Sequence, residues 1–209
     1  KDKSCIMKNY KKNLELLTKN HVYSKEMEHD ACGVGVIVST EGKKSREIVE
    51  HGIEALKAVW HRGAVDADGK TGDGAGIHVE IPKDFFIEKI EVTGHDYDNA
   101  EICVGMIFLP RNDYSAQESC KTIVESELTK NNFSIYGWRQ VPVNPKILGQ
   151  KALQTMPEII QVLFKSNDQN LLDKNLERKI YETRKKIEKK AFQLSLNNFY
   201  ICSISSKSI

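Results

Sequence analysis

A cysteine placed at the head of an apolar, glycine-spaced run constrains this chain more than any other feature. Cys32 is followed by residues 33–38 with the sequence GVGVIV. A short apolar run rich in β-branched residues is typical of a buried strand, so we expect residues 33–39 to form the first strand of a sheet. A fold that satisfies this pattern buries the run and leaves the thiol of Cys32 at the leading end of the strand.

A glycine-dense segment follows further along the chain, beginning at His61-Arg62-Gly63. Five glycines lie within residues 63–76. Glycine loses more backbone entropy on folding than any other residue, so such a cluster is expected where the chain turns tightly and its backbone approaches a ligand. The Cys32 thiol, the Arg62 guanidinium and this loop can meet in one small pocket. That pocket would suit an enzyme that attacks a substrate held by its carboxylate.

The same segment invites comparison with a phosphate-binding loop. That motif places four residues between its first glycine and a Gly-Lys pair, and it follows a strand and opens a helix. Here five residues separate Gly63 from Gly69-Lys70, and the segment follows an expected helix and leads into an expected strand. We therefore do not expect nucleotide phosphates to bind here.

The composition is that of an ordinary globular chain. The 209 residues are 40% hydrophobic and 29% charged, with a formal net charge of +2. No run approaches the roughly 18 apolar residues of a membrane helix, so no membrane association is expected. The basic residues between 178 and 190 are interleaved with glutamates and lack an accompanying aromatic series. We expect a solvated helix face there and no nucleic-acid partner.

Five cysteines occur without any C-x-x-C pair. We expect free thiols, mostly buried, in a reducing compartment. Neither the cysteines nor the histidines show the spacing of metal ligands, so no metal site is expected. Residues 1–31 are rich in lysine but contain no arginine and no continuous apolar stretch, which argues against a secretory signal or an organellar transit peptide. The expected location is the cytoplasm.

Hydrophobic periodicity predicts a mixture of strands and helices. Strands are expected at 33–39, 75–81, 101–109, 134–143, 159–164 and 199–205. Helices are expected between an N-cap at Ser45 and a terminator at Gly63, and at 117–128 and 173–194. Helices packed against largely non-parallel strands indicate an α+β fold that allows one sheet to stack on another. Because little chain follows the last strand, we also expect the chain to be part of a longer protein.

Several motifs together resemble a known family. The matching segments are 30–35 (DACGVG), 61–64 (HRGA), 67–76 (ADGKTGDGAG), 137–142 (GWRQVP), 148–149 (LG) and 177–181 (ERKIY). In these segments the chain resembles the glutaminase domains of glutamate synthases, which are class II glutamine amidotransferases of the N-terminal-nucleophile hydrolase superfamily. The run from Asp68 to Gly76 is the most specific of the segments, and the resemblance extends over residues 22–209.

The resemblance implies a four-layer αββα sandwich, incomplete at the C-terminus, in which residues 1–31 are a propeptide and residues 32–209 a partial amidotransferase domain. Cys32 becomes the first residue when the propeptide is removed, and its freed α-amino group acts as the base. Attack of the thiolate on the glutamine side-chain amide releases ammonia and leaves a γ-glutamyl thioester for hydrolysis. By the same resemblance, Arg62 binds the α-carboxylate of glutamine. The expected pocket-lining residues are Thr71, Gly72, Asp73 and Gly74.

The resemblance also implies partners outside this segment. In the complete enzymes of the family, ammonia passes to a downstream synthase domain, where 2-oxoglutarate becomes glutamate with FMN and an iron–sulfur cluster. The electrons come from NADPH, NADH or ferredoxin, so an electron-donating small subunit or ferredoxin is the expected protein partner. No cofactor is expected within residues 1–209 themselves.

Two departures from the family pattern bear on activity. Cys32 follows Ala31, so its nitrogen is an amide and cannot act as a base until the propeptide is removed. No Asn-Gly-Glu segment, which supplies the oxyanion hole in the family, follows Ser205. Loss of one oxyanion donor costs about a hundredfold or more in rate, so we expect the isolated chain to have little or no glutaminase activity.

Two other interpretations are compatible with the same residues. The glutaminase domain of another class II amidotransferase, one that feeds nucleotide or asparagine synthesis, would share Cys32 and the His-Arg-Gly motif. A divergent or truncated domain that only docks onto or regulates a partner would keep the fold without the chemistry. The presence of Cys32, Arg62 and the intact glycine loop argues against such decay.

Overall fold

The computed structural model describes residues 12, 15–16, 19, 33–59, 65–171 and 173–209. The chain divides into two compact units, residues 1–34 and 35–209. Described positions 12, 15, 16 and 19 of the first unit are helical. The helices and strands with defined bounds all lie in the second unit, so the architecture is that of residues 35–209.

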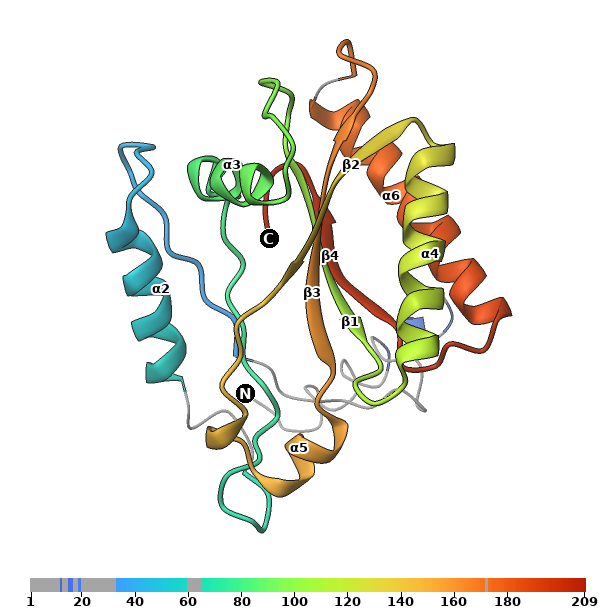
Figure 1. The fold of residues 1–209 in the computed structure, drawn as a ribbon. Coiled ribbons are helices and arrows are strands. Elements are labelled where there is room, and N and C mark those ends of the chain that lie inside the picture. The colour runs from blue at the N-terminus through green and yellow to red at the C-terminus, as the bar shows by residue number, and fades with distance from the viewer. Residues whose placement is uncertain (1–11, 13–14, 17–18, 20–32, 60–64, 172) are drawn as a thin grey trace. The chain divides into compact units, whose positions relative to one another are not determined.

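A four-stranded antiparallel sheet forms the centre of residues 35–209 (Figure 1). Its strands are β1 (Cys103–Leu109), β2 (Phe133–Gln140), β3 (Glu158–Ser166) and β4 (Tyr200–Ser205). They lie in the order β2-β3-β1-β4, which places β3 and β1 in the middle. Both middle strands are apolar over most of their length, as expected for strands whose two faces are covered.

Helices α4 (Tyr114–Lys130) and α6 (Asp173–Gln193) lie side by side on one face of this sheet (Figure 1). Helix α4 begins after Asp113, whose carboxylate accepts a hydrogen bond from the amide of Ala116 at 2.9 Å. Each helix presents apolar residues three or four positions apart, which forms one buried stripe. The buried apolar residues of the two stripes are Cys120, Ile123, Val124, Leu128, Leu176, Ile180, Ile187 and Ala191.

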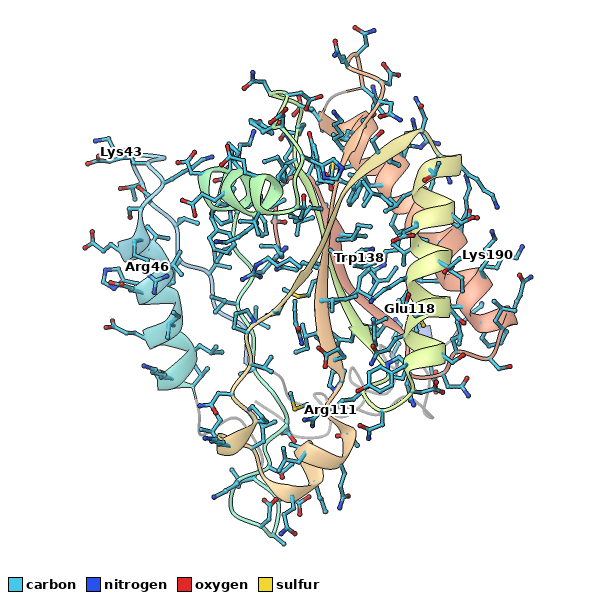
Figure 2. All side chains as sticks on the ribbon, in the orientation of Figure 1. Lys43, Arg46, Arg111, Glu118, Trp138 and Lys190 are labelled. Carbon is cyan, nitrogen blue, oxygen red and sulfur yellow. The ribbon has the colours of Figure 1, made fainter. Side chains whose placement is uncertain are left out.

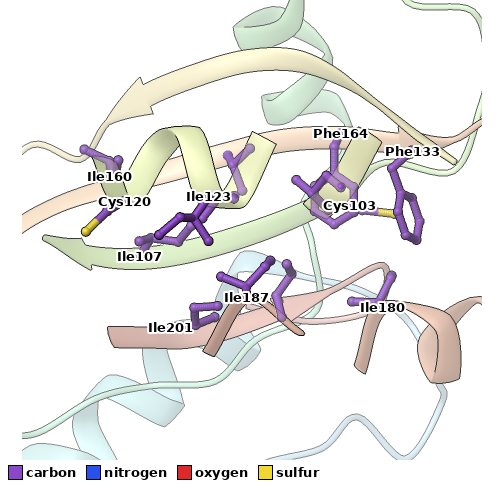
Figure 3. Packing of buried hydrophobic residues seen from close by; sticks show 14 of the residues in the cluster. Cys103, Ile107, Cys120, Ile123, Phe133, Ile160, Phe164, Ile180, Ile187 and Ile201 are labelled. Atoms are coloured by element: carbon purple, nitrogen blue, oxygen red, sulfur yellow. The ribbon is translucent and has the colours of Figure 1, made fainter. Parts of the chain in front are cut away.

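The side chains of the two stripes meet the sheet in one continuous core (Figure 3). Phe133 of β2 and Phe164 of β3 pack edge to face within it, with ring centroids 5.3 Å apart. Burial of each large side chain contributes about 1.5–3 kcal/mol. Polar contacts surround this core: the indole of Trp138 donates to Glu125 at 2.6 Å, and Lys190 of α6 pairs with Glu127 of α4. Trp138 and Lys190 are labelled in Figure 2.

Helix α3 (Lys83–Val92) packs on the opposite face of the sheet through a second, smaller core. Its members are Ile81, Phe86, Ile90, Ile102, Val104, Tyr136 and Leu163. The chain reaches this face through a short antiparallel pairing of residues 79–81 with residues 207–209. The amide of Val79 donates to the carbonyl of Ile209 at 2.9 Å, and the amide of Ile209 donates back at 2.8 Å.

Three further helical segments complete the described elements. They are α2 (Arg46–Ala58), a 3-10 helix (Pro145–Ile147) and α5 (Gln150–Thr155). Helix α2 starts where the sequence indicates, because the Ser45 hydroxyl accepts a hydrogen bond from the amide of Ile48 at 3.4 Å. The helix ends at Ala58 with Val59 as its C-cap, earlier than the terminator expected at Gly63, which itself lies outside the described residues.

Most of the predicted elements are confirmed. The mixed fold of helices on an antiparallel sheet agrees with the α+β expectation. Six predicted segments agree with the observed elements to within a few residues at each end. They correspond to strands β1, β2, β3 and β4 and to helices α4 and α6. Helices α3 and α5 were not predicted, because each is short and carries little apolar periodicity.

Two predicted strands are wrong in the described residues. Residues 33–39 form no strand, and Val36 and Val38 are 80% and 71% exposed. Of the predicted strand at 75–81, only residues 79–81 are paired. Alternating β-branched residues favour extended backbone, but a strand also needs a neighbouring edge whose amides and carbonyls it can bind. Neither segment has such an edge along its full length among the described residues.

Replacing Ile187 with alanine is expected to lower the free energy of unfolding by about 2–5 kcal/mol, because it leaves a cavity beneath α6. Ile187 has no exposed surface. Urea denaturation followed by tryptophan fluorescence measures the change. The control Lys189→Ala, on the exposed face of the same helix, should change the value by less than about 0.5 kcal/mol. Equal effects in the two variants would contradict the described packing of α6.

Candidate functional site

The glycine-dense segment begins with a tight hairpin between Val65 and Gly72, which form an antiparallel bridge. The amide of Asp66 donates to the carbonyl of Thr71 at 2.8 Å, and the amide of Gly69 donates to the carbonyl of Asp66 at 2.9 Å. Gly69 has a φ of +66°, a left-handed conformation that glycine adopts without a steric penalty. This explains why a glycine stands at the tip of the hairpin.

The carboxylate of Asp68 holds the returning limb of the hairpin. One of its oxygens, Oδ1, accepts hydrogen bonds from the amides of Lys70 at 2.9 Å and Thr71 at 2.7 Å. The other, Oδ2, accepts from the hydroxyl of Thr71 at 2.6 Å. Aspartate is suited to this role because its short side chain can bond to backbone amides two and three residues ahead.

These hydrogen bonds to Thr71 and to the amide of Lys70 lower the pKa of Asp68 well below its ordinary value of 3.8. A group whose pKa is lower in the folded state stabilises that state at every pH above its ordinary pKa. The stabilisation is lost only as the pH falls below 3.8 toward the folded value. Asp68 is therefore a carboxylate throughout the neutral range, acting only as an acceptor.

A second segment, distant in the sequence, lies against this hairpin. Gly149 is buried and is the N-cap residue of α5. A Cβ added there would lie 2.2 Å from Oγ1 of Thr71, 2.4 Å from Oδ2 of Asp68 and 2.6 Å from the backbone nitrogen of Thr71. Two residues further on, the ammonium of Lys151 contacts Asp66 at 2.5 Å across 85 positions of sequence. The hairpin and α5 therefore form one contact site.

The structure places Thr71 and Gly72 on the returning limb of the hairpin, and Asp73 and Gly74 directly after it. Thr71 is half-buried, whereas Gly72, Asp73 and Gly74 are exposed. Gly74 has a φ of +95°, which again requires glycine. The expected nucleophile Cys32 and the expected carboxylate-binding Arg62 lie outside the described residues, so their positions relative to this loop stay predictions.

The described residues also bear on other kinds of site. No three His, Cys, Asp or Glu side chains among them are grouped in a way that could hold a metal ion. No helix in the same part of the chain is both long enough and apolar enough to cross a bilayer.

The thiols of Cys103 and Cys120 are buried, and burial raises the pKa of both, that of Cys120 to about 11. They are packing residues rather than nucleophiles.

Asp68 and Gly149 lie in segments that carry the family resemblance, but the sequence analysis assigned neither of them a role in the site. Asp68 carried a local signal, because an aspartate followed by glycine is typical of a tight turn. Gly149 belongs to the matching segment 148–149, but nothing in the sequence indicated its contact with the hairpin, which arises only when α5 is placed by β2 and β3 on either side of it in the sequence.

Comparison with known proteins identifies the family. The family model for class II glutamine amidotransferases matches residues 32–209, a match that begins at Cys32. The chain belongs to the class II glutamine amidotransferases.

Several similar proteins of known name are glutamate synthases. Over 200 residues the chain is 51% identical to the glutamate synthase [NADPH] large chain of Azospirillum brasilense, covering 96% of this chain and 13% of that protein. It is 38% identical over 201 residues to the ferredoxin-dependent glutamate synthase of Pyropia yezoensis, covering 93% and 12%. It is 39% identical over 184 residues to ferredoxin-dependent glutamate synthase 1 of Arabidopsis thaliana, covering 87% and 11%. The chain thus spans a small part of the length of these relatives.

Replacing Asp68 with alanine is expected to release the amides of Lys70 and Thr71 to solvent. Hydrogen exchange measured by NMR at neutral pH should show lower protection of these two amides than in wild type, because the carboxylate that accepts from both of them is gone. The control Asp96→Ala removes an exposed aspartate in the loop after α3 and should leave both amides unchanged. Unchanged protection in the Asp68 variant would contradict the described hairpin.

Proposed function

We propose that this chain is the glutaminase part of a glutamate synthase and that Cys32 is its nucleophile. The observation that carries the proposal is the family match, which begins at Cys32. The names of the relatives support the choice of glutamate synthase over amidotransferases that feed nucleotide or asparagine synthesis.

In this proposal residues 1–31 are a propeptide, and its removal converts the amide nitrogen of Cys32 into an amine. An α-amino group has an ordinary pKa of about 7.7–8.0, so part of it is unprotonated at neutral pH. The amine takes the thiol proton while the sulfur forms a bond to the side-chain carbonyl carbon of glutamine. Collapse of the tetrahedral intermediate breaks the carbon–nitrogen bond, and the proton leaves with ammonia.

The second half of the reaction returns the cysteine to its starting state. Water, activated by the same amine, attacks the γ-glutamyl thioester. The carbon–sulfur bond breaks, glutamate leaves, and the thiol regains its proton. Because one amine serves both steps, the chemistry requires no separate histidine base beside Cys32.

The substrate is held, in this proposal, by Arg62 and by the loop of Thr71, Gly72, Asp73 and Gly74. A guanidinium suits the α-carboxylate of glutamine because its planar array of N–H donors matches the two carboxylate oxygens. The loop supports the proposal because its residues after Thr71 are exposed and lie at the end of a hydrogen-bonded hairpin. Exposed backbone next to a fixed turn can offer amides and carbonyls to a small polar ligand.

We also propose that the complete domain is a four-layer αββα sandwich. The described sheet would form one of the two inner layers, and α4 and α6 the outer layer that covers it. Exposed valines at positions 36 and 38, in an extended apolar segment, support a second sheet, because such residues are unfavourable in water and suited to a pleated surface.

The complete enzyme would use the ammonia for glutamate synthesis. In our proposal it acts in the cytoplasm and passes ammonia to a synthase domain that converts 2-oxoglutarate to glutamate with FMN and an iron–sulfur cluster. Electrons would come from a small subunit that oxidises NADPH, or from ferredoxin. The names of the relatives, which include both an NADPH-dependent and a ferredoxin-dependent enzyme, support this scheme.

A test uses the open reading frame that encodes this chain, expressed at full length. We expect N-terminal sequencing of the mature protein to begin at Cys32. Cys32→Ala should abolish glutamine-dependent synthesis of glutamate from 2-oxoglutarate and leave ammonia-dependent synthesis within about twofold of wild type, since only the glutaminase step needs the thiol.

Two outcomes would overturn the proposal. A mature N-terminus at another residue would remove the amine base from the mechanism. Full glutamine-dependent activity in the Cys32 variant would remove the nucleophile and favour a domain that only docks onto a partner.

A further inference from the structure

The contact between Gly149 and the 65–72 hairpin is closer than any side chain would permit. The three atoms nearest to a Cβ added at this position belong to Thr71 and Asp68, at 2.2 to 2.6 Å. One of the three is the backbone nitrogen of Thr71, which cannot rotate away as a flexible side chain could. Only glycine therefore allows α5 to support the hairpin at this distance.

The hydrogen bonds of the hairpin also define what Thr71 can do. Its hydroxyl donates to Oδ2 of Asp68 at 2.6 Å and its amide donates to Oδ1 at 2.7 Å. Both donors of this residue are thus directed to one carboxylate, away from any ligand. Asp68 in turn accepts from both Lys70 and Thr71, and the backbone amide of Gln150, beside Gly149, further lowers its pKa.

We propose that Thr71, Asp68 and Gly149 are positioning residues that fix the base of the glutamine-binding loop, and that the residues contacting glutamine are those after Thr71. This inference rests on the proposed function and makes it more specific. The unit formed by these three residues, which we call the loop clasp, holds Thr71 against α5. Gly72 and Gly74 then extend from a fixed point, so their backbone groups are preorganised for the substrate.

A consequence is that disturbing the loop clasp should weaken glutamine binding without changing the reactivity of the nucleophile. A methyl group at position 149 must displace the backbone of Thr71, and with it the start of the loop. Misplacement of a binding element by about 1 Å reduces rates by up to about 100-fold. The effect belongs in KM for glutamine, because the thiol and its amine are on another segment of the chain.

The experiment compares Gly149→Ala with wild type in the processed full-length protein. We expect KM for glutamine to rise by about 10- to 100-fold, while ammonia-dependent glutamate synthesis stays unchanged. Inactivation by a diazoketone analogue of glutamine should slow by a similar factor. Alkylation of Cys32 by iodoacetamide, which needs no amino-acid pocket, should proceed at the wild-type rate.

Gly52→Ala is the matched control, since Gly52 lies in α2 with no atom within 4 Å of an added Cβ and no unusual φ. We expect wild-type kinetics for it. Two variants of Thr71 cover the case in which Gly149→Ala does not fold. Thr71→Val removes the hydroxyl that donates to Asp68 and should raise KM as Gly149→Ala does, whereas Thr71→Ser keeps that hydroxyl and should raise KM by a smaller factor.

The outcomes separate this inference from the proposed function. Wild-type KM in both Gly149→Ala and Thr71→Val would overturn the loop clasp while leaving Cys32 as the nucleophile. A loss of kcat with unchanged KM in Thr71→Val would also overturn it, because Thr71 would then act on the reaction rather than on binding. Failure of the diazoketone to label Cys32 in the wild-type protein would overturn the proposed function itself.

Discussion

Strand β1 is hydrogen-bonded along both edges, to β3 on one side and to β4 on the other, and the remaining described elements are arranged around it. Alternate residues of a strand point to opposite faces, so Cys103 and Ile107 face α4 and α6 while Val104 faces the core beneath α3. Gly105 lies on the helix side, where an added Cβ would be 2.8 Å from a methyl carbon of Val162. The register of this one strand therefore determines what both faces of the sheet bury.

The sequence predicted best where a local pattern was enough to specify the structure. The stripe of α6, with Leu176, Ile180 and Ile187 at helical spacing, is visible without any tertiary information. The strand expected at 33–39 shows the limit of such reasoning. Its residues favour extended backbone, yet pairing depends on an edge supplied from elsewhere in the chain. Helix α3 was not predicted because its apolar residues do not form one stripe at helical spacing. Phe85 and Phe86 are adjacent in the sequence, and only Phe86 is buried.

The candidate site also has one part that the sequence predicted and one part that it did not. Glycine composition marked residues 63–76 as a loop that approaches a ligand, and the structure supplies the physical reason for Gly69 and Gly74 in their positive φ values. The support beneath this loop could not be read from the sequence. Gly149 is an ordinary glycine before a short helix until the sheet brings α5 against Asp68 and Thr71. A contact of this kind depends on long-range placement, and a single sequence without its fold contains no signal for it.

The pairing of residues 79–81 with 207–209 has a mechanical consequence. Two hydrogen bonds of 2.9 and 2.8 Å join Val79 to Ile209, and Val79 lies three positions after the last glycine of the dense segment, Gly76. A displacement of Ile209 would be transmitted through these two hydrogen bonds to Val79 and so to the outgoing end of the loop. The incoming limb is braced separately by α5. The loop is thus held at one end by the contact of Thr71 with α5 and at the other by the pairing of Val79 with Ile209. A movement of one contact relative to the other would change the distance that the loop has to span.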